Sequence, residues 1–188
     1  MVGSRDELAN RVLDELRPGL SADVLRQIDD LAAALAAARR IVCYGVGREG
    51  LMMKALAMRL YHLGLDAHVV GDMSTPPLIG GDVLLTSAGP GHFSTVEALS
   101  GVARGAGAKV ICITATPDGP DPAKADLIVT LPAQTMAADR GDEASSVLPM
   151  GSLFEVLMFL FFEILVLELR DRLDLDPETM RARHTNLE

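Results

Sequence analysis

The sequence predicts an α/β protein, a three-layer α/β/α sandwich around a five-stranded parallel sheet. Five short apolar segments of strand type occur between residues 40 and 131, and segments with helical spacing alternate with them. Strands that alternate with helices need crossover connections, which make neighbouring strands parallel and cover both faces of the sheet. Because such crossovers are right-handed, we expect the strand order 2-1-3-4-5.

The first 40 residues predict a helical hairpin that belongs to the same domain as the sheet. Apolar residues recur with helical spacing over 5–17 and over 21–40, and a Pro-Gly pair separates the two segments. Residues 41–188 are expected to form the rest of the domain. A chain of 188 residues is typical of a single domain, since compact domains usually have roughly 100–200 residues.

The remaining elements follow from changes in the hydrophobic period along the chain. The strands are predicted at 40–45, 67–70, 82–87, 109–114 and 126–131. The longer helices are predicted at about 51–63, 94–105 and 150–170, and a short helix begins near Asp176. Residues 132–148 are polar and irregular, and a loop of this length in a compact domain is often functional.

The helix predicted at 150–170 is apolar on nearly all sides and holds four of the five phenylalanines. One face of a sheet cannot cover such a helix, so we expect it to pack on another subunit as well. The segment also contains Glu155, Glu163 and Glu168. Three carboxylates argue against a membrane span.

Charge and cysteine content exclude several classes of partner. The chain has 17 Lys and Arg against 26 Asp and Glu, a formal net charge of -9, which argues against a nucleic-acid or anionic-membrane partner. Cys43 and Cys112 both lie in apolar segments, which indicates buried thiols in a reducing compartment. The N-terminus has no secretory signal pattern, so we expect a cytoplasmic protein.

Two glycine-rich loops follow the first and third predicted strands. Their sequences are Gly-Val-Gly-Arg-Glu-Gly at 45–50 and Ser-Ala-Gly-Pro-Gly-His at 87–92. In the order 2-1-3 both loops meet at one crevice, at the carboxyl ends of neighbouring strands. The first loop also fits the G-x-G-x-x-G pattern of dinucleotide sites, with Asp72 as the ribose-binding acid. Two converging helix N-termini favour a smaller ligand, an anion or a polyol.

Four motifs together resemble the sugar isomerase (SIS) domain family, over about residues 20–188. They are Gly45-x-Gly47-Arg48-x-Gly50, Ala57-Met58-Arg59-Leu60-x-His62-Leu63-Gly64, Pro149-x-Gly151-Ser152-x-Phe154-Glu155 and Ala182-Arg183-His184-x-x-Leu187-Glu188. Within the family the chain is most similar to the 6-phospho-3-hexuloisomerases. The resemblance implies a flavodoxin-like sandwich and a homotetramer. It also implies interconversion of 3-hexulose 6-phosphate and fructose 6-phosphate through an enediol, with no metal and no cofactor.

Glu155 is the candidate base for this chemistry. It is a lone acid between Phe154 and Val156, and an apolar setting raises the pKa of a carboxyl towards neutrality. The alternative is an ion pair with Arg59 or Arg140 across an interface. The resemblance assigns His184 to ring opening or to proton movement between oxygens, from a neighbouring subunit.

The candidate binding residues come from both loops and from two arginines. The glycines, Ser87 and Arg48 are expected to line the pocket, while Arg59 and Arg183 supply positive charge. Ser94 and Thr95 are candidate hydroxyl donors, and His92 is a candidate partner for sugar hydroxyls. The full set is Gly45, Gly47, Arg48, Glu49, Arg59, Ser87, Gly89, Gly91, His92, Ser94, Thr95 and Arg183.

Both loops depart from the family pattern. Glu49 stands where the family usually has serine, and the hydroxyl-rich second loop is replaced by Ala-Gly-Pro-Gly-His-Phe at 88–93. Glu49 either points outward as a first-turn acid, which the helix dipole favours, or points inward. An inward carboxylate would repel a phosphate and predicts a ligand whose nearby end is uncharged or carries an amine. The alternatives are therefore a non-catalytic SIS module that binds a sugar derivative, or an isomerase for a different sugar derivative.

Overall fold

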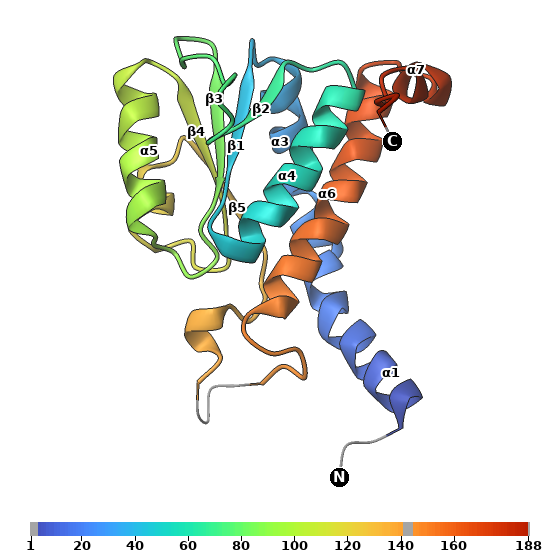
Figure 1. Cartoon of the computed structure of the whole chain (residues 1–188). Helices are drawn as coiled ribbons and strands as arrows, with labels where there is room; N and C mark the ends of the chain where they lie inside the picture. The colour runs from blue at the N-terminus through green and yellow to red at the C-terminus, as the bar shows by residue number, and fades with distance from the viewer. Residues whose placement is uncertain (1–3, 141–144, 188) are drawn as a thin grey trace.

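The computed structural model describes residues 4–140 and 145–187 and has the predicted three-layer architecture (Figure 1). The five strands form one parallel sheet in the order β2-β1-β3-β4-β5. Their bounds are Ile41–Tyr44 for β1, Ala67–Val69 for β2, Val83–Ser87 for β3, Lys109–Thr114 for β4 and Leu127–Thr130 for β5. The prediction of the fold class and of the strand order is therefore confirmed.

The helices follow the predicted periodicity with two differences. The α-helices are α1 (Arg5–Leu16), α2 (Ala22–Leu25), α3 (Gln27–Ala36), α4 (Gly47–His62), α5 (Ser94–Gly105), α6 (Ser152–Arg172) and α7 (Pro177–Ala182). The 3-10 turns are η1 (Arg17–Leu20), η2 (Pro122–Lys124) and η3 (Met136–Ala138). The segment predicted as one helix at 21–40 forms α2 and α3, and α4 begins four residues earlier than predicted.

The early start of α4 has a steric cause. Val46 is extended and caps the helix, and Gly47 enters it with a φ of +58°. A Cβ on Gly50 would lie 2.4 Å from the carbonyl oxygen of Gly45, so only glycine permits this tight turn. The helix therefore begins inside the glycine-rich loop and directs its first N–H groups towards the end of β1.

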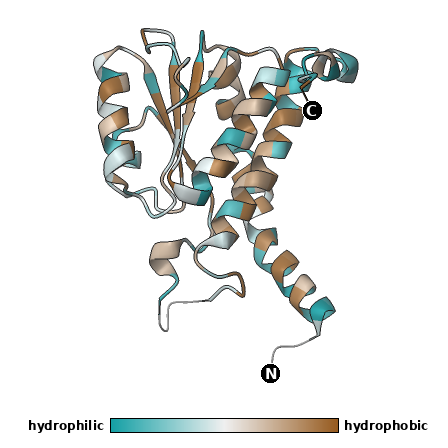
Figure 2. Cartoon of the chain, viewed as in Figure 1, coloured by the Kyte–Doolittle hydropathy of each residue, from teal (hydrophilic) through white to brown (hydrophobic). Residues whose placement is uncertain are grey.

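The sheet is covered on both faces. Helix α5 packs on β3 and β4 on one side, and α4 packs on β1 and β2 on the other, with α3 beside β5 (Figure 1). Successive residues of β1 alternate between the two cores, with Ile41 and Cys43 on the α4 side and Val42 on the α5 side. Figure 2 shows hydrophobic residues concentrated on the strands and along α6.

Helix α6 is covered mainly within its own chain, by α4, α3, α1 and η1 rather than by the sheet alone. Phe154, Phe161 and Phe162 are buried there, whereas Phe159 is 41% exposed. Helices of the same chain thus cover much of α6, and its packing on another subunit as well stays a prediction. No described helix is long and apolar enough to cross a membrane.

The long segment after β5 is held in place by α1 and by its own polar side chains. The hydroxyl of Ser146 donates to Glu15 at 2.6 Å, and the N–H of Val147 donates to the same carboxylate at 3.1 Å. Asp139 accepts the N–H of Met150 and the amide of Gln134. These contacts place the two ends of the segment beside the first turn of α6, at the carboxyl edge of the sheet.

Candidate active site

A cavity of about 260 Å³ lies where the first turns of α4 and α6 meet the loop after β3. Four segments that are distant in sequence line it. The α4 segment contributes Val46, Gly47, Arg48 and Glu49, and the loop after β3 contributes Pro90 and Phe93. The segment after β5 contributes Thr135 and Met136, and the start of α6 contributes Met150, Gly151, Phe154 and Glu155.

Glu49 points inward. Its side chain is buried, and the N–H of Gly89 donates to its Oε2 at 3.1 Å. Burial raises the pKa of Glu49 from 4.5 to about 7, the N–H of Gly89 and the hydroxyl of Ser87 oppose the rise, and the charge of Glu155 adds to it. The Ser87 hydroxyl is buried beside this carboxyl but makes no well-aligned hydrogen bond within the part of the chain that the structure describes. Of the two orientations left open by the sequence, the structure selects the inward one.

Glu155 faces the same cavity from the first turn of α6. Its Oε2 lies 2.7 Å from Nε of Arg48, and its side chain is 11% exposed. Burial raises the pKa of this carboxyl, and the guanidinium of Arg48 partly opposes the rise. The pair is not aligned as a hydrogen bond, so Oε2 is a buried oxygen without a hydrogen-bond partner among the described residues. The sequence suggested Arg59 or Arg140 as the partner, but the ion-pair partner is Arg48.

The glycines of the two loops allow β1, β3 and α6 to approach closely. A Cβ on Gly45 would lie 2.6 Å from the Ser87 hydroxyl. A Cβ on Gly89 would lie 2.8 Å from both Glu49 Oε1 and the ring of Phe154. Gly47 differs, since a Cβ there would meet nothing within 4 Å. Gly45 and Gly89 therefore permit the close backbone packing around the two carboxyls.

Four candidate residues in and after the second loop lie outside the cavity lining, although Pro90 and Phe93 of the same loop belong to it. His92 lies 3.2 Å from the buried carboxylate of Asp121, which also accepts the N–H of Phe93 at 2.7 Å. Gly91 packs against Thr116 and Gly119. The remaining candidates, Ser94 and Thr95, are exposed in the first turn of α5. The structure thus joins His92 to Asp121 and leaves these four residues outside the cavity lining of a single chain.

The C-terminal motif lies at the other end of α4. The guanidinium of Arg183 donates to the carbonyl oxygen of His62 at 3.1 Å, and the rings of His62 and His184 are 5.4 Å apart. Because His62 is 13 residues beyond Glu49, about 20 Å of helix separates this motif from the cavity. Figure 1 shows α7 and the C-terminus at the end of α6 opposite its first turn. One chain alone therefore does not bring His184 to Glu155.

Arg59 is also remote from the cavity in this chain. It lies in the last turn of α4, 3.6 Å from the carboxylate of Glu163 on α6. Asp72, the candidate ribose-binding acid of the dinucleotide alternative, likewise does not line the cavity. Within residues 4–140 and 145–187 no group of three or more His, Cys, Asp or Glu side chains is arranged to hold a metal ion.

Several lining residues were missed by sequence reasoning. Thr135 and Met136 come from the long loop that was expected to be functional, and its length was the available signal. Phe154 was part of the motif that contains Glu155, but as an apolar residue it offered no chemical signal. Gly151 has a φ of +79°, and a Cβ there would lie 2.5 Å from the backbone nitrogen of Met136. A glycine is therefore needed where the loop closes over the start of α6.

Two curated proteins are similar to nearly the whole chain. The chain is 35% identical over 182 residues to a protein of Bacillus subtilis named 3-hexulose-6-phosphate isomerase, covering 97% of this chain and 98% of the relative. It is 36% identical over 186 residues to a protein of the same name from Mycobacterium gastri, covering 97% of this chain and 92% of that one.

Two further findings identify the family. A crystal structure from Methanococcus jannaschii, described as inferring a molecular function of 3-hexulose-6-phosphate isomerase, matches with a TM-score of 0.80 and 30% identity over 97% of this chain and 98% of that one. The profile of the SIS domain matches residues 34–160. Full-length relatives named as isomerases support a sugar-phosphate isomerase. The chain belongs to the SIS domain family.

Proposed function

We propose that this protein interconverts 3-hexulose 6-phosphate and fructose 6-phosphate. The observation that carries the proposal is Glu155, a buried carboxyl that lines the cavity, in a chain similar along 97% of its length to proteins named for this reaction. A cavity of about 260 Å³ is slightly smaller than most ligand pockets, which are roughly 300–1,000 Å³. This size favours a single sugar derivative over an extended dinucleotide.

Glu155 acts as the base in this proposal. Moving the carbonyl between C2 and C3 requires removal of a proton from one carbon and its return to the other, through an enediol. Partial desolvation makes a carboxylate a better base than it is in water, and the charge of Arg48 favours the ionised form of Glu155. Because Oε2 is buried and faces Arg48, we assign removal of the substrate proton to the other carboxyl oxygen of Glu155, Oε1.

The phosphate is proposed to bind at the open side of the cavity. Gly47 is exposed at the start of α4, and Arg48 has a side chain that is 59% exposed. A helix N-terminus and a guanidinium are both suitable for a phosphate, and the raised pKa of the inward Glu49 lessens the repulsion that a carboxylate there would exert. Ser94 and Thr95 at the start of α5 are the proposed hydroxyl donors. No metal or cofactor is part of this proposal.

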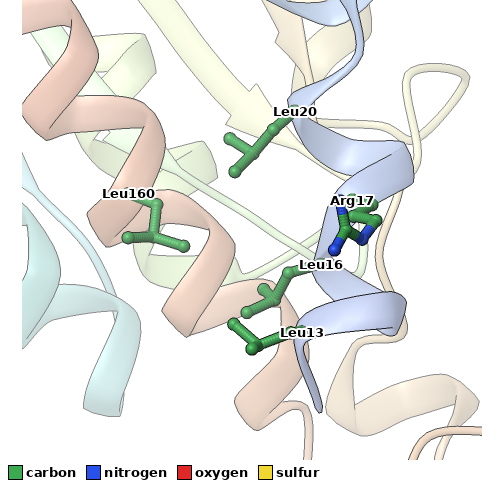
Figure 3. A pocket seen from close by; sticks show the side chains of 5 residues that line it. All are labelled: Leu13, Leu16, Arg17, Leu20 and Leu160. Carbon is green, nitrogen blue, oxygen red and sulfur yellow. The ribbon is translucent and has the colours of Figure 1, made fainter. Parts of the chain in front are cut away.

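The complete site is proposed to need a second copy of the chain. Leu51 and Phe159 are large apolar side chains that remain exposed on α4 and α6. A groove of about 540 Å³ runs between α1, η1 and α6, where leucines of all three elements face one another (Figure 3). We infer a homotetramer in the cytoplasm in which these faces are covered, and in which a neighbouring copy supplies His184 for ring opening and Arg183 for charge.

The function is tested with purified protein and 3-hexulose 6-phosphate, followed by enzymatic detection of fructose 6-phosphate. The proposal predicts conversion in both directions, without an added metal ion or nucleotide. A protein that binds fructose 6-phosphate in calorimetry but converts neither sugar phosphate would favour a non-catalytic binding module. Conversion of an aldose phosphate alone would assign an isomerase of different specificity.

The sharing of His184 between subunits is tested by mixing two variants, Glu155→Gln and His184→Gln. Each is expected to be nearly inactive alone, because each lacks one proton-transferring group. After unfolding and refolding together, a site can contain Glu155 from one copy and His184 from another. Random assembly predicts recovery of up to about one quarter of wild-type activity, because two independent choices must both be correct. If the mixture is no more active than the separate variants, sharing of His184 is wrong.

A further inference from the structure

Glu49 and Glu155 form a pair of buried carboxyls in one cavity. Glu49 reaches the cavity from the first turn of α4, and Glu155 reaches it from the first turn of α6. Each of the two residues is 8% exposed. The family pattern has serine at position 49, so the first carboxyl is a feature of this chain. Two acids placed in one apolar crevice are a common arrangement for proton transfer.

The two carboxyls differ in their surroundings. Glu155 faces the cation of Arg48, which favours its charged form. Glu49 forms no ion pair within the described residues, and its charged form is favoured by the Gly89 N–H and the Ser87 hydroxyl. The charge of Glu155 and burial both favour the protonated form of Glu49. These surroundings favour an ionised Glu155 and a protonated Glu49 in the same cavity.

We propose that Glu49 is a second catalytic carboxyl, which moves a proton between the two substrate oxygens while Glu155 moves one between the two carbons. This inference rests on the proposed isomerase function and gives that site its acid. The Gly89 N–H anchors Oε2 of Glu49 and so fixes the orientation of the carboxyl towards the cavity that it lines. A carboxyl has two oxygens and can contact neighbouring substrate oxygens in turn.

The protons balance in each direction. From fructose 6-phosphate, Glu155 takes the proton from C3 as the carboxyl of Glu49 gives its proton to the C2 oxygen, which forms the enediol. Glu49 then accepts the proton of the C3 hydroxyl. Glu155 returns its proton to C2, and the carbonyl now stands at C3. Both carboxyls end in their starting protonation states, and no oxidant, reductant or co-substrate is required.

The experiment compares wild type, Glu49→Gln and Glu49→Ser for kcat, KM and exchange of the C3 proton of fructose 6-phosphate in D2O. Glu49→Gln retains an oxygen for the Gly89 N–H but cannot transfer a proton. We expect kcat to fall roughly 10²–10⁴-fold, with KM changed less than about threefold. C3 exchange is also expected to fall, because Glu49 protonates the C2 oxygen as Glu155 removes the C3 proton. The matched control is Glu97→Gln, an exposed acid in the first turn of α5.

The outcomes separate this inference from the proposed function. Wild-type protein that neither exchanges nor isomerises fructose 6-phosphate would overturn both. Active wild type with an unchanged kcat in Glu49→Gln would overturn the role of Glu49 alone, as would an effect confined to KM. Glu49→Ser carries the family's usual residue and is used if Glu49→Gln does not fold by circular dichroism. Full activity in Glu49→Ser would likewise show that the carboxyl is not catalytic.

Discussion

Glu155→Gln is expected to lower kcat for the isomerisation of fructose 6-phosphate by roughly 10²–10⁴-fold, the usual contribution of a general base. Gln has nearly the same shape as Glu, so the substitution removes the basic lone pair and leaves the packing beside Phe154 in place. KM is expected to change by less than about threefold, because the lost interaction acts mainly in the transition state. Steady-state kinetics measure both constants.

The control for this variant is Glu168→Gln on the same helix. Glu168 forms a partly exposed ion pair with Arg172 at 3.4 Å, and such pairs contribute at most about 1 kcal/mol. Its kinetics are expected to match those of wild type. If Glu155→Gln retained more than about a tenth of the wild-type kcat, Glu155 would not be the base, and its pairing with Arg48 would be structural.

Glu49→Gln is expected to stabilise the protein at alkaline pH. Burial raises the pKa of Glu49 to about 7 from 4.5, so the folded state binds this proton more tightly than the unfolded state does. The resulting stability is fully present below pH 4.5 and is lost as pH rises through 7. A shift of this size corresponds to about 3 kcal/mol of unfolding free energy at pH 8, which Gln does not lose.

Urea unfolding at pH 4 and at pH 8 measures this effect. The difference between Glu49→Gln and wild type is expected to grow by up to about 3 kcal/mol from the lower to the higher pH. Comparing the two proteins at each pH cancels the contributions of the other titrating groups. A difference that is the same at both values, or a variant less stable than wild type at pH 8, would contradict the raised pKa.

The structure directs the Glu49 carboxyl into the cavity, where burial raises its pKa. The sequence alone could not show this for Glu49, because a first-turn acid is also favoured by the helix dipole when it points to solvent. Its orientation depends on where the loop after β3 places the N–H of Gly89. That placement is a tertiary contact over 40 residues of sequence, which local patterns do not encode.

The sheet, by contrast, could be predicted almost completely. Its strands are short apolar segments bounded by glycine and proline, and the crossover rule leaves few orders for five of them. The convergence of the two loops followed directly from that order. The predicted start of α4 was wrong, because the conformations available to glycine let the helix begin at Gly47, inside the loop.

The site was predictable in its residue types but less so in its pairings. Glu155 was found from a motif and from its apolar neighbours, whereas its partner Arg48 depends on the packing of α4 against α6. His92 was selected from its place in the loop, yet the buried Asp121 from a distant turn determines its position. Such contacts arise from the assembled fold.

The central claim is that Glu155 moves a proton between C2 and C3 of a ketose phosphate. Proton NMR of fructose 6-phosphate incubated in D2O with wild type and with Glu155→Gln tests it most directly. We predict loss of the C3 proton signal with wild type and retention of that signal with Glu155→Gln. Loss of a C1 proton signal with the C3 signal intact, or equal loss at C3 with both proteins, would contradict the account.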